Sequence, residues 1–262
     1  MTTTAPARVA RRLLGPAVFV AALALWQAWA AHKDSFLVPT VTAVAERAWD
    51  VWPTSGFIDQ VTATLGRLAA GYVLGAAIGV AAGLVLGSSR AARRTFEPLQ
   101  EFLRSIPAIA IVPAAIVIFG LGDATRIAVI AFAVCFPVLV STIEGVRAVS
   151  PETRDTARML HVGPAELILR IYAPAALPSI VAGLRVALAI GLIVTVISEF
   201  VVGSGDGVGR YIVVQRTLYD APGVYGGILF LGLLGYVLNT LFVVGERRLL
   251  SWHYAVAGES AR

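Results

Sequence analysis

Six long apolar runs, separated by shorter polar segments, dominate the pattern of hydrophobic and polar positions along the chain. An α-helix of about 20 residues crosses the hydrocarbon core of a bilayer, and each run is close to that length. The predicted spans cover residues 13–31, 64–87, 101–120, 125–146, 177–202 and 224–245. The pattern therefore predicts an all-α polytopic membrane protein whose residues 1–262 form one transmembrane domain.

Composition supports this assignment. Hydrophobic residues make up 58% of the 262 residues, charged residues only 14%, and the mean hydropathy is +0.80. A soluble domain carries about 25% charged residues. The soluble globular, disordered and fibrous classes are excluded on this ground.

The net charge of +5 is distributed unevenly between the polar segments. With the N-terminus in the cytoplasm, fourteen basic residues fall in inner segments and five in outer ones, as the positive-inside rule requires. The inner set is Arg8, Arg11, Arg12, Arg90, Arg93, Arg94, Arg104, Arg147, Arg154, Arg158, Arg170, Arg247, Arg248 and Arg262, and the outer set is Lys33, Arg47, Arg126, Arg210 and Arg216. This bias predicts six helices with both termini in the cytoplasm, and contact with membrane lipid rather than nucleic acid.

The first apolar run can be interpreted as a secretory signal or as a retained first transmembrane helix. Three arginines precede it, and Ala28-Trp29-Ala30 resembles the cleavage site of a secretory signal. The run from Leu13 to Ala31 is long for a signal peptide, so a retained first helix is favoured.

Two polar segments are predicted to be ordered. Residues 40–52, behind Pro39, place apolar side chains on one helical face and predict a short amphipathic helix on the outer surface. The inner segment from Ser150 to Pro174 predicts a helix from Pro151 to about Leu160, an elbow at residues 161–164, and a second short helix that stops before Pro174. A helix–elbow–helix of this kind offers a cytoplasmic partner a rigid handle.

The inner segment resembles the cytoplasmic loop of bacterial ABC importer permeases, whose pattern is EAA-x3-G-x9-I-x-L-P. Here the pattern reads Asp155-Thr156-Ala157, three residues, His161, nine residues, then Ile171-Tyr172-Ala173-Pro174. His161 replaces the motif glycine, and Gly163, two residues on, is expected to supply the flexible turn. Collinear pieces along residues 35–250 are similar to the nitrate/sulfonate/taurine branch, among them Arg104-Ser105-Ile106-Pro107, Phe119-Gly120-Leu121-Gly122 and Gly183-Leu184-Arg185.

The resemblance implies a type I ABC importer permease in the bacterial plasma membrane. Such permeases work as two copies, here expected to be a homodimer, with two cytoplasmic ATPase subunits and an extracytoplasmic solute-binding protein. The chain itself would be no enzyme and would hold no cofactor, because ATP and Mg bind to the ATPases. A small, anionic solute such as a sulfonate, nitrate or carboxylate is expected. An ion-coupled secondary transporter and a homodimeric channel are the alternatives.

Two sets of residues are candidates for function. The resemblance assigns coupling to the ATPase to Asp155, Thr156, Ala157, Arg158, His161, Gly163 and Pro174. The pathway candidates are Pro107 and Pro113, because proline kinks a helix, and Arg185 and Glu199, because charge inside a membrane is costly. Packing kinks, snorkelling of Arg185 to the interface and contact of Glu199 with water are the alternative readings.

Other features of the sequence add no chemistry. The glycine-rich run at residues 203–209 lacks the Gly-Lys-Ser/Thr of a phosphate loop and predicts an outer turn. Cys135 stands alone in an apolar run and is expected to be a packed thiol. No catalytic grouping and no metal site are predicted.

Overall fold

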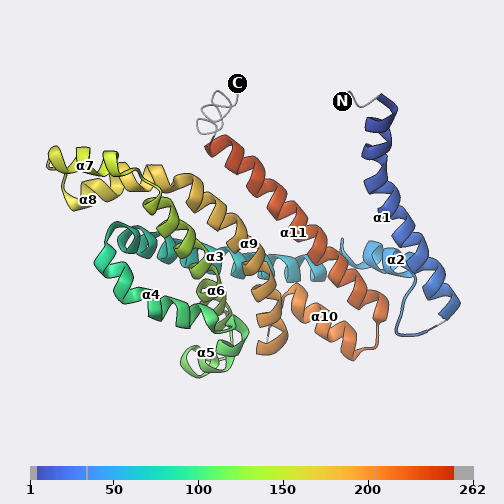
Figure 1. Cartoon of the computed structure of the whole chain (residues 1–262). Helices are drawn as coiled ribbons and strands as arrows, with labels where there is room; N and C mark the ends of the chain where they lie inside the picture. The colour runs from blue at the N-terminus through green and yellow to red at the C-terminus, as the bar shows by residue number, and fades with distance from the viewer. Residues whose placement is uncertain (1–4, 34, 204, 251–262) are drawn as a thin grey trace. The chain divides into compact units, whose positions relative to one another are not determined.

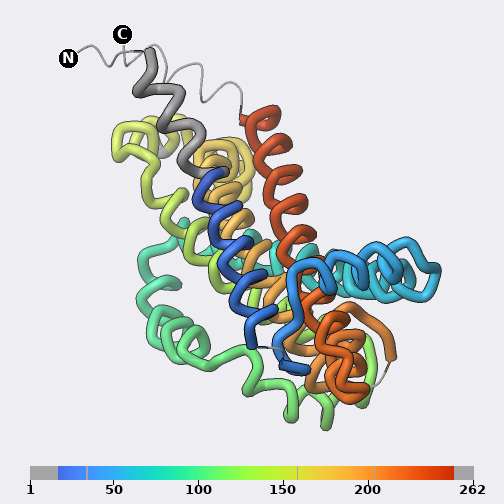
Figure 2. The backbone as a smooth tube through the Cα atoms, turned by 90° about the vertical axis from the view of Figure 1, so that its right-hand side faces the viewer, coloured from blue at the N-terminus to red at the C-terminus, as the bar shows by residue number. Residues whose placement is uncertain are grey.

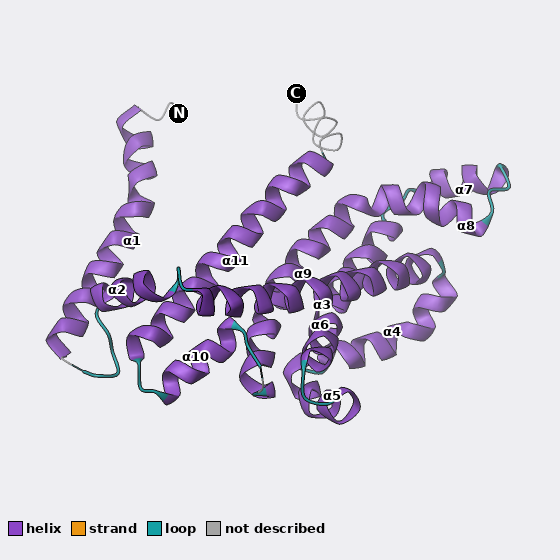
Figure 3. Cartoon of the chain, turned by 180° about the vertical axis from the view of Figure 1, so that it is seen from behind, coloured by secondary structure: helices purple, strands orange, loops and turns teal. Residues whose placement is uncertain are grey.

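The computed structural model describes residues 5–33, 35–203 and 205–250, and side chains from residue 17 on except Arg158. All regular structure in these residues is helical (Figure 3). In chain order the helices are α1 (Ala5–Lys33), α2 (Val41–Val51), α3 (Ser55–Ser88), α4 (Arg90–Ser105), η1 (Ala108–Ile111), α5 (Val112–Phe119), α6 (Asp123–Arg147), α7 (Pro151–Met159), α8 (Pro164–Leu167), η2 (Ile168–Tyr172), α9 (Ala173–Val202), α10 (Val208–Thr217) and α11 (Ala221–Leu249).

Four helical stretches in the described residues are long and apolar enough to cross a membrane. They are Ser55–Ser88, Asp123–Arg147, Pro164–Val202 and Ala221–Leu249, and a bent pair formed by Arg90–Ser105 and Ala108–Phe119 makes up to five. The structure therefore has a polytopic, all-helical architecture with four or five apolar spans.

The predicted span at residues 101–120 differs from the structure, because it is not one kinked helix. The chain bends by 87° between α4 and the η1–α5 segment. Ile106 has extended backbone angles, as expected of the residue before a proline, and Pro107 has no N–H to continue the α4 ladder. Pro113 stands in the first turn of α5, where a missing N–H costs nothing, so it starts a helix rather than kinking one.

The chain divides into two compact units. The larger comprises residues 60–210 and 232–262, and the smaller comprises residues 1–59 and 211–231.

In the larger unit, α6 and α9 lie side by side and antiparallel, joined by the α7–α8 segment (Figure 1). Glycines at every fourth position of α3, from Gly71 to Gly87, face α6. A Cβ atom on Gly79 would stand 2.7 Å from the carbonyl oxygen of Cys135, so only glycine permits this approach. Small residues bring helix backbones together in this way inside membranes, where packing replaces the hydrophobic driving force. Buried valines and isoleucines of α5, α6 and α9 form the core beside this contact.

In the smaller unit, the predicted amphipathic helix is confirmed as α2. Thr40 is its N-cap, and the Thr40 hydroxyl accepts a hydrogen bond from the Ala43 N–H at 3.2 Å. Val44 and Ala48 form its buried face, and Arg47 pairs with Asp220 at 2.7 Å.

Candidate functional site

The first site is the elbow, which we define as residues 150–174 and which lies at one end of the larger unit, with α5 at the other end (Figure 2). Ser150 caps α7, because its hydroxyl accepts a hydrogen bond from the Thr153 N–H at 3.3 Å. The pKa of the Glu152 carboxyl lies below its usual value, because it accepts hydrogen bonds from its own backbone N–H and from Ser150. The start of α7 therefore follows the sequence prediction.

The turn after α7 is made by His161, and not by Gly163 as expected. His161 adopts a left-handed conformation with φ of 50°, and the Val162 N–H donates to the Ala157 carbonyl at 3.1 Å. This is the Schellman arrangement, whose left-handed residue is usually glycine. Gly163 has an ordinary φ of −63°. The glycine of the motif thus corresponds to the left-handed residue that ends the first helix, and histidine occupies that position here.

The second helix of the elbow does not stop before Pro174. The α8, η2 and α9 helices form one continuous helical run from Pro164 to Val202. The η2 segment is a π-helical turn directly before Pro174, and the Ala173 N–H bonds to the Ile168 carbonyl. A proline removes an N–H and crowds the carbonyl four residues earlier, and the wider π turn accommodates both effects.

Arg154 fastens the elbow to the spans. Its Nη2 donates to the carbonyl oxygens of Val146 at 2.9 Å and Arg147 at 3.1 Å, in the last turn of α6. Its guanidinium group also lies 5.7 Å from the ring centre of Tyr172, ahead of α9. A displacement of α7 would therefore be transmitted to both α6 and α9.

The coupling candidates do not share one environment. Five of them are exposed: Asp155, Thr156, His161, Gly163 and Pro174. Ala157 is only 4% exposed and packs inward. The side chain of Arg158 lies outside the described residues.

Sequence reasoning overlooked Met159 and Leu160, whose side chains are 72% and 71% exposed at the tip of the elbow. Two large apolar side chains beside charged neighbours are typical of a docking surface. Their position at the end of an otherwise polar helix is the sequence feature that could have indicated this surface.

The second site is a buried ionic cluster at the opposite end of the larger unit. Glu199 of α9 is 0% exposed and accepts hydrogen bonds from Arg67 Nη1 at 3.0 Å and from the Thr64 hydroxyl at 2.9 Å. Arg67, on α3, also donates through Nε to Asp123 Oδ1 of α6 at 2.6 Å. Within the described residues Glu199 is therefore shielded from water, and its cluster joins three helices in their packed interior.

The glycine-rich run folds over this cluster. The Gly209 N–H donates to Glu199 Oε2 at 2.9 Å, and the Val208 N–H donates to the Thr64 hydroxyl at 2.9 Å. Gly207 has φ of 130° and leaves no room for a Cβ atom beside the Glu199 carboxylate. The glycine-rich run thus binds a carboxylate of the chain itself, through the Gly209 N–H and the close approach of Gly207. For this reason its sequence resembles a loop that binds an external anion.

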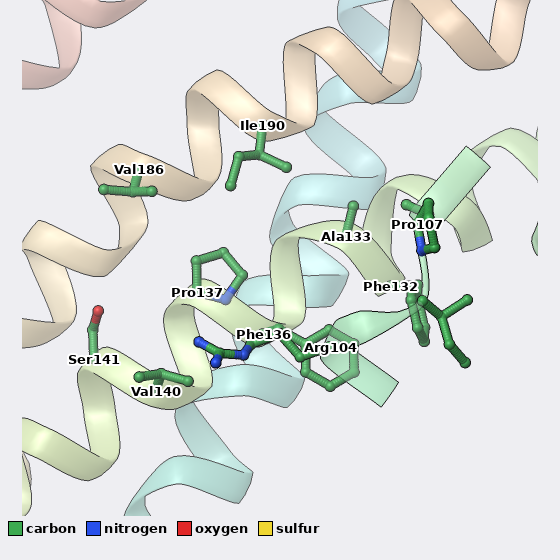
Figure 4. A pocket seen from close by; sticks show the side chains of 12 residues that line it. Arg104, Pro107, Phe132, Ala133, Phe136, Pro137, Val140, Ser141, Val186 and Ile190 are labelled. Carbon is green, nitrogen blue, oxygen red and sulfur yellow. The ribbon is translucent and has the colours of Figure 1, made fainter. Parts of the chain in front are cut away.

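A cavity of about 480 Å³ opens between the α4–η1 break, α6 and α9 (Figure 4). Pro107 lines it, whereas Pro113, Arg185 and Glu199 do not. Arg185 is exposed on α9, and its Nε donates to Asn239 Oδ1 of α11 at 3.2 Å. Of the four pathway candidates, Pro107 therefore lines this cavity and the other three do not; Pro107 shares it with Arg104, Pro137 and Ser141. Within the described residues, no three His, Cys, Asp or Glu side chains are placed to share a metal ion.

Comparison with known proteins identifies the family. Residues 71–251 match the family described as binding-protein-dependent transport system inner membrane component. A probable ABC transporter permease of Brucella melitensis is 31% identical over 82% of this chain and 87% of its own length. A putative aliphatic sulfonates transport permease of Bacillus subtilis is 29% identical over 94% of this chain and 88% of its own. A bicarbonate transport system permease of Synechococcus elongatus is 30% identical over 74% and 70%.

Solved structures agree on the fold. The chain matches a structure of inward-facing conformations of the MetNI methionine ABC transporter with a TM-score of 0.65, at 20% identity, over 73% of this chain and 94% of that one. The chain belongs to the family of binding-protein-dependent transport system inner membrane components, the permeases of ABC transporters.

Proposed function

We propose that the chain is the permease subunit of an ATP-driven importer of a small anion, in the bacterial plasma membrane with both termini cytoplasmic. The observation that carries the proposal is the elbow: a protruding tip with two exposed apolar side chains, fastened by Arg154 to α6 and towards α9. A partner that grips such a tip can move two apolar helices at once. The elbow therefore has the features expected of the segment through which an ATPase subunit moves the helices of a permease.

The force would come from two cytoplasmic ATPase subunits, which bind ATP and Mg. Their closure would draw the elbows of two permease copies together, and the pathway between the copies would turn from inward-facing to outward-facing. A solute-binding protein would then release its ligand into the pathway. Three of the exposed members of the coupling set would contact the ATPase together with Met159 and Leu160: Asp155, Thr156 and His161. Ala157, which is buried, would support α7 from its inner side.

The solutes of two relatives support a substrate class. The named solutes are aliphatic sulfonates and bicarbonate, two small anions. A pathway with few fixed charges leaves the choice among such anions to the binding protein.

The test is reconstitution of the permease with its ATPase and binding protein in proteoliposomes. We expect ATP-dependent uptake that survives collapse of the proton gradient. Leu160→Ser is expected to lower binding-protein-stimulated ATP hydrolysis and ATPase copurification at least tenfold, because it removes apolar contact from the tip. Its thermal stability should change little, since the side chain is 71% exposed.

Leu160→Met is the matched control and should keep near-normal coupling, because it preserves apolar volume. Uptake driven by an ion gradient without ATP would establish a secondary transporter instead. Passive flux in both directions would establish a channel.

A further inference from the structure

The cavity beside the α4–η1 break carries one charge in an apolar wall. Ten of its twelve lining residues are apolar, and Arg104 and Ser141 are the two polar ones. Its volume of about 480 Å³ suits a small solute with a few waters. Figure 4 shows the guanidinium group of Arg104 in the same part of the cavity as Pro137 and Val140 of α6.

Arg104 shares this cavity with residues of an apolar span. Pro137 lies near the middle of α6 (Asp123–Arg147), one of the apolar stretches long enough to cross a membrane, and Ser141 lies one turn further toward its C-terminus. A cation inside a bilayer is energetically costly, so such a residue faces a water-filled space or a partner. The side chain is 52% exposed and lines the cavity, so its guanidinium group is open to a solute there.

The broken backbone beside Arg104 also lines this cavity. Residues 106–107 are not helical, and irregular backbone at membrane depth occurs where it lines an aqueous cavity or is covered by protein. Across the cavity, Pro137 lacks an N–H, so the Ala133 carbonyl loses its helical partner, and both residues line the cavity.

Most of the hydrogen-bonding capacity of Arg104 is uncommitted. In the part of the chain that the structure describes, its one ion pair is between Nη2 and Glu101 Oε1, at 2.7 Å on the same helix, and Glu101 is 62% exposed. A guanidinium group has five N–H donors in a planar fork that matches the oxygens of carboxylates and other oxyanions. Arg185, the other intramembrane candidate, is engaged with Asn239 and lies outside the cavity wall.

We infer that Arg104 is the anion-binding group of the translocation pathway, and that the cavity between α4, α6 and α9 receives a small oxyanion such as a sulfonate, nitrate or bicarbonate. The inference rests on the proposed function and adds to it a residue and a place. The arginine offsets the desolvation of the anion at mid-membrane, and the apolar wall keeps the contact weak enough for release. Selection among anions stays with the binding protein, because one guanidinium group accepts any of them.

The test uses the full reconstituted transporter and measures maximal uptake of labelled ethanesulfonate, nitrate and bicarbonate at saturating binding protein, together with ATP hydrolysis. Arg104→Gln is expected to lower uptake of the transported anion at least tenfold while binding-protein-stimulated ATP hydrolysis falls less than threefold. The ratio of anion imported to ATP hydrolysed therefore drops. Arg104→Lys, which keeps the charge, should retain at least a third of uptake.

Arg94→Gln is the matched control, because Arg94 is an exposed arginine on the same helix outside the cavity. It should leave uptake and ATP hydrolysis within twofold of the wild type. If Arg104→Gln fails to assemble, Glu101→Gln decides: removal of the competing carboxylate should raise maximal anion uptake, and an unchanged or lower rate overturns the inference.

The outcomes separate this inference from the proposed function. Anion uptake that Arg104→Gln leaves unchanged overturns the assignment of Arg104 and leaves the importer intact. A wild-type transporter that imports an uncharged or cationic solute and none of the three anions overturns the substrate class and, with it, this site. ATP-independent uptake overturns the importer itself.

Discussion

The two ends of the larger unit handle charge in opposite ways. At the elbow, charged side chains stand at the surface, and the Glu166–Arg170 pair is 49% and 79% exposed. At the opposite end, Arg67 is 5% exposed and Glu199 is 0% exposed, and they bind each other and the glycine-rich run. Parts of α6 and α9 lie at both ends. The elbow leaves its polar groups available to a partner, whereas the polar groups of the opposite end bind one another.

The difference indicates where the unit can change and where it cannot. A buried ion pair without its partner leaves an uncompensated charge, so the Arg67–Glu199 cluster is expected to keep α3, α6 and α9 together through the transport cycle. Exposed pairs cost little to break, so the elbow can exchange its contacts for those of an ATPase. The same type of substitution at the two ends should therefore have very different effects.

The largest effect is expected from Glu199→Gln. Arg67 would lose its buried partner, and the expected destabilisation is about 3 kcal/mol, the lower end of the range for a broken buried pair, because Asp123 and Asp206 still contact Arg67. The measurement is thermal denaturation of the purified permease in detergent, followed by loss of monodisperse protein.

Glu166→Gln is the control for the same chemical change at the elbow. Its pair with Arg170 is exposed, so we expect less than about 0.5 kcal/mol and an unchanged denaturation temperature. Equal effects of the two substitutions would contradict the contrast between the ends.

A smaller effect is expected from Arg154→Gln. The substitution removes charge-assisted hydrogen bonds to the Val146 and Arg147 carbonyls, which are worth about 1.5–3 kcal/mol in a typical protein. Because it unfastens α7 from α6, uptake per ATP hydrolysed should fall more than ATPase copurification does. Arg170→Gln is the control, since Arg170 is 79% exposed. Normal uptake per ATP hydrolysed in Arg154→Gln would show that the hydrogen bonds of Arg154 to α6 do not transmit the movement of α7 to the spans.

The helices and the elbow could be predicted from the sequence because each depends on local patterns. Apolar runs locate α3, α6, α9 and α11, and Ser150 with Pro151 marks the start of α7. Charge counting and the coupling pattern are likewise local in sequence. What such patterns cannot show is which side chains meet after packing.

The contacts that sequence reasoning missed are between distant segments. Glu199 was expected either on the pathway or in contact with water, but Arg67, 132 residues earlier in the chain, and the Gly209 N–H enclose it. Arg104 was counted as an inner charge, and only the bend before Pro107 places it against the middle of α6. The glycine positions of α3 recur at every fourth residue and were visible, but their meaning depends on the partner helix that they approach.

The smallest predicted effect, and the most local, concerns His161. A residue with a Cβ atom in the left-handed conformation is strained, and glycine is not, so His161→Gly should stabilise the end of α7 by about 0.5–1 kcal/mol after the extra freedom of glycine in the unfolded chain is counted. Slower amide hydrogen exchange at Leu160 and Val162 would measure this gain. Gly163→Ala is the matched control: its φ of −63° suits any residue, and an added Cβ would meet nothing within 4 Å, so the change should be neutral or slightly stabilising. If His161→Gly instead loosened α7, the imidazole would have to make a stabilising contact that outweighs its strain. Because the residue is exposed at the tip, a loss of ATPase coupling without any loss of stability would place that contact on the partner.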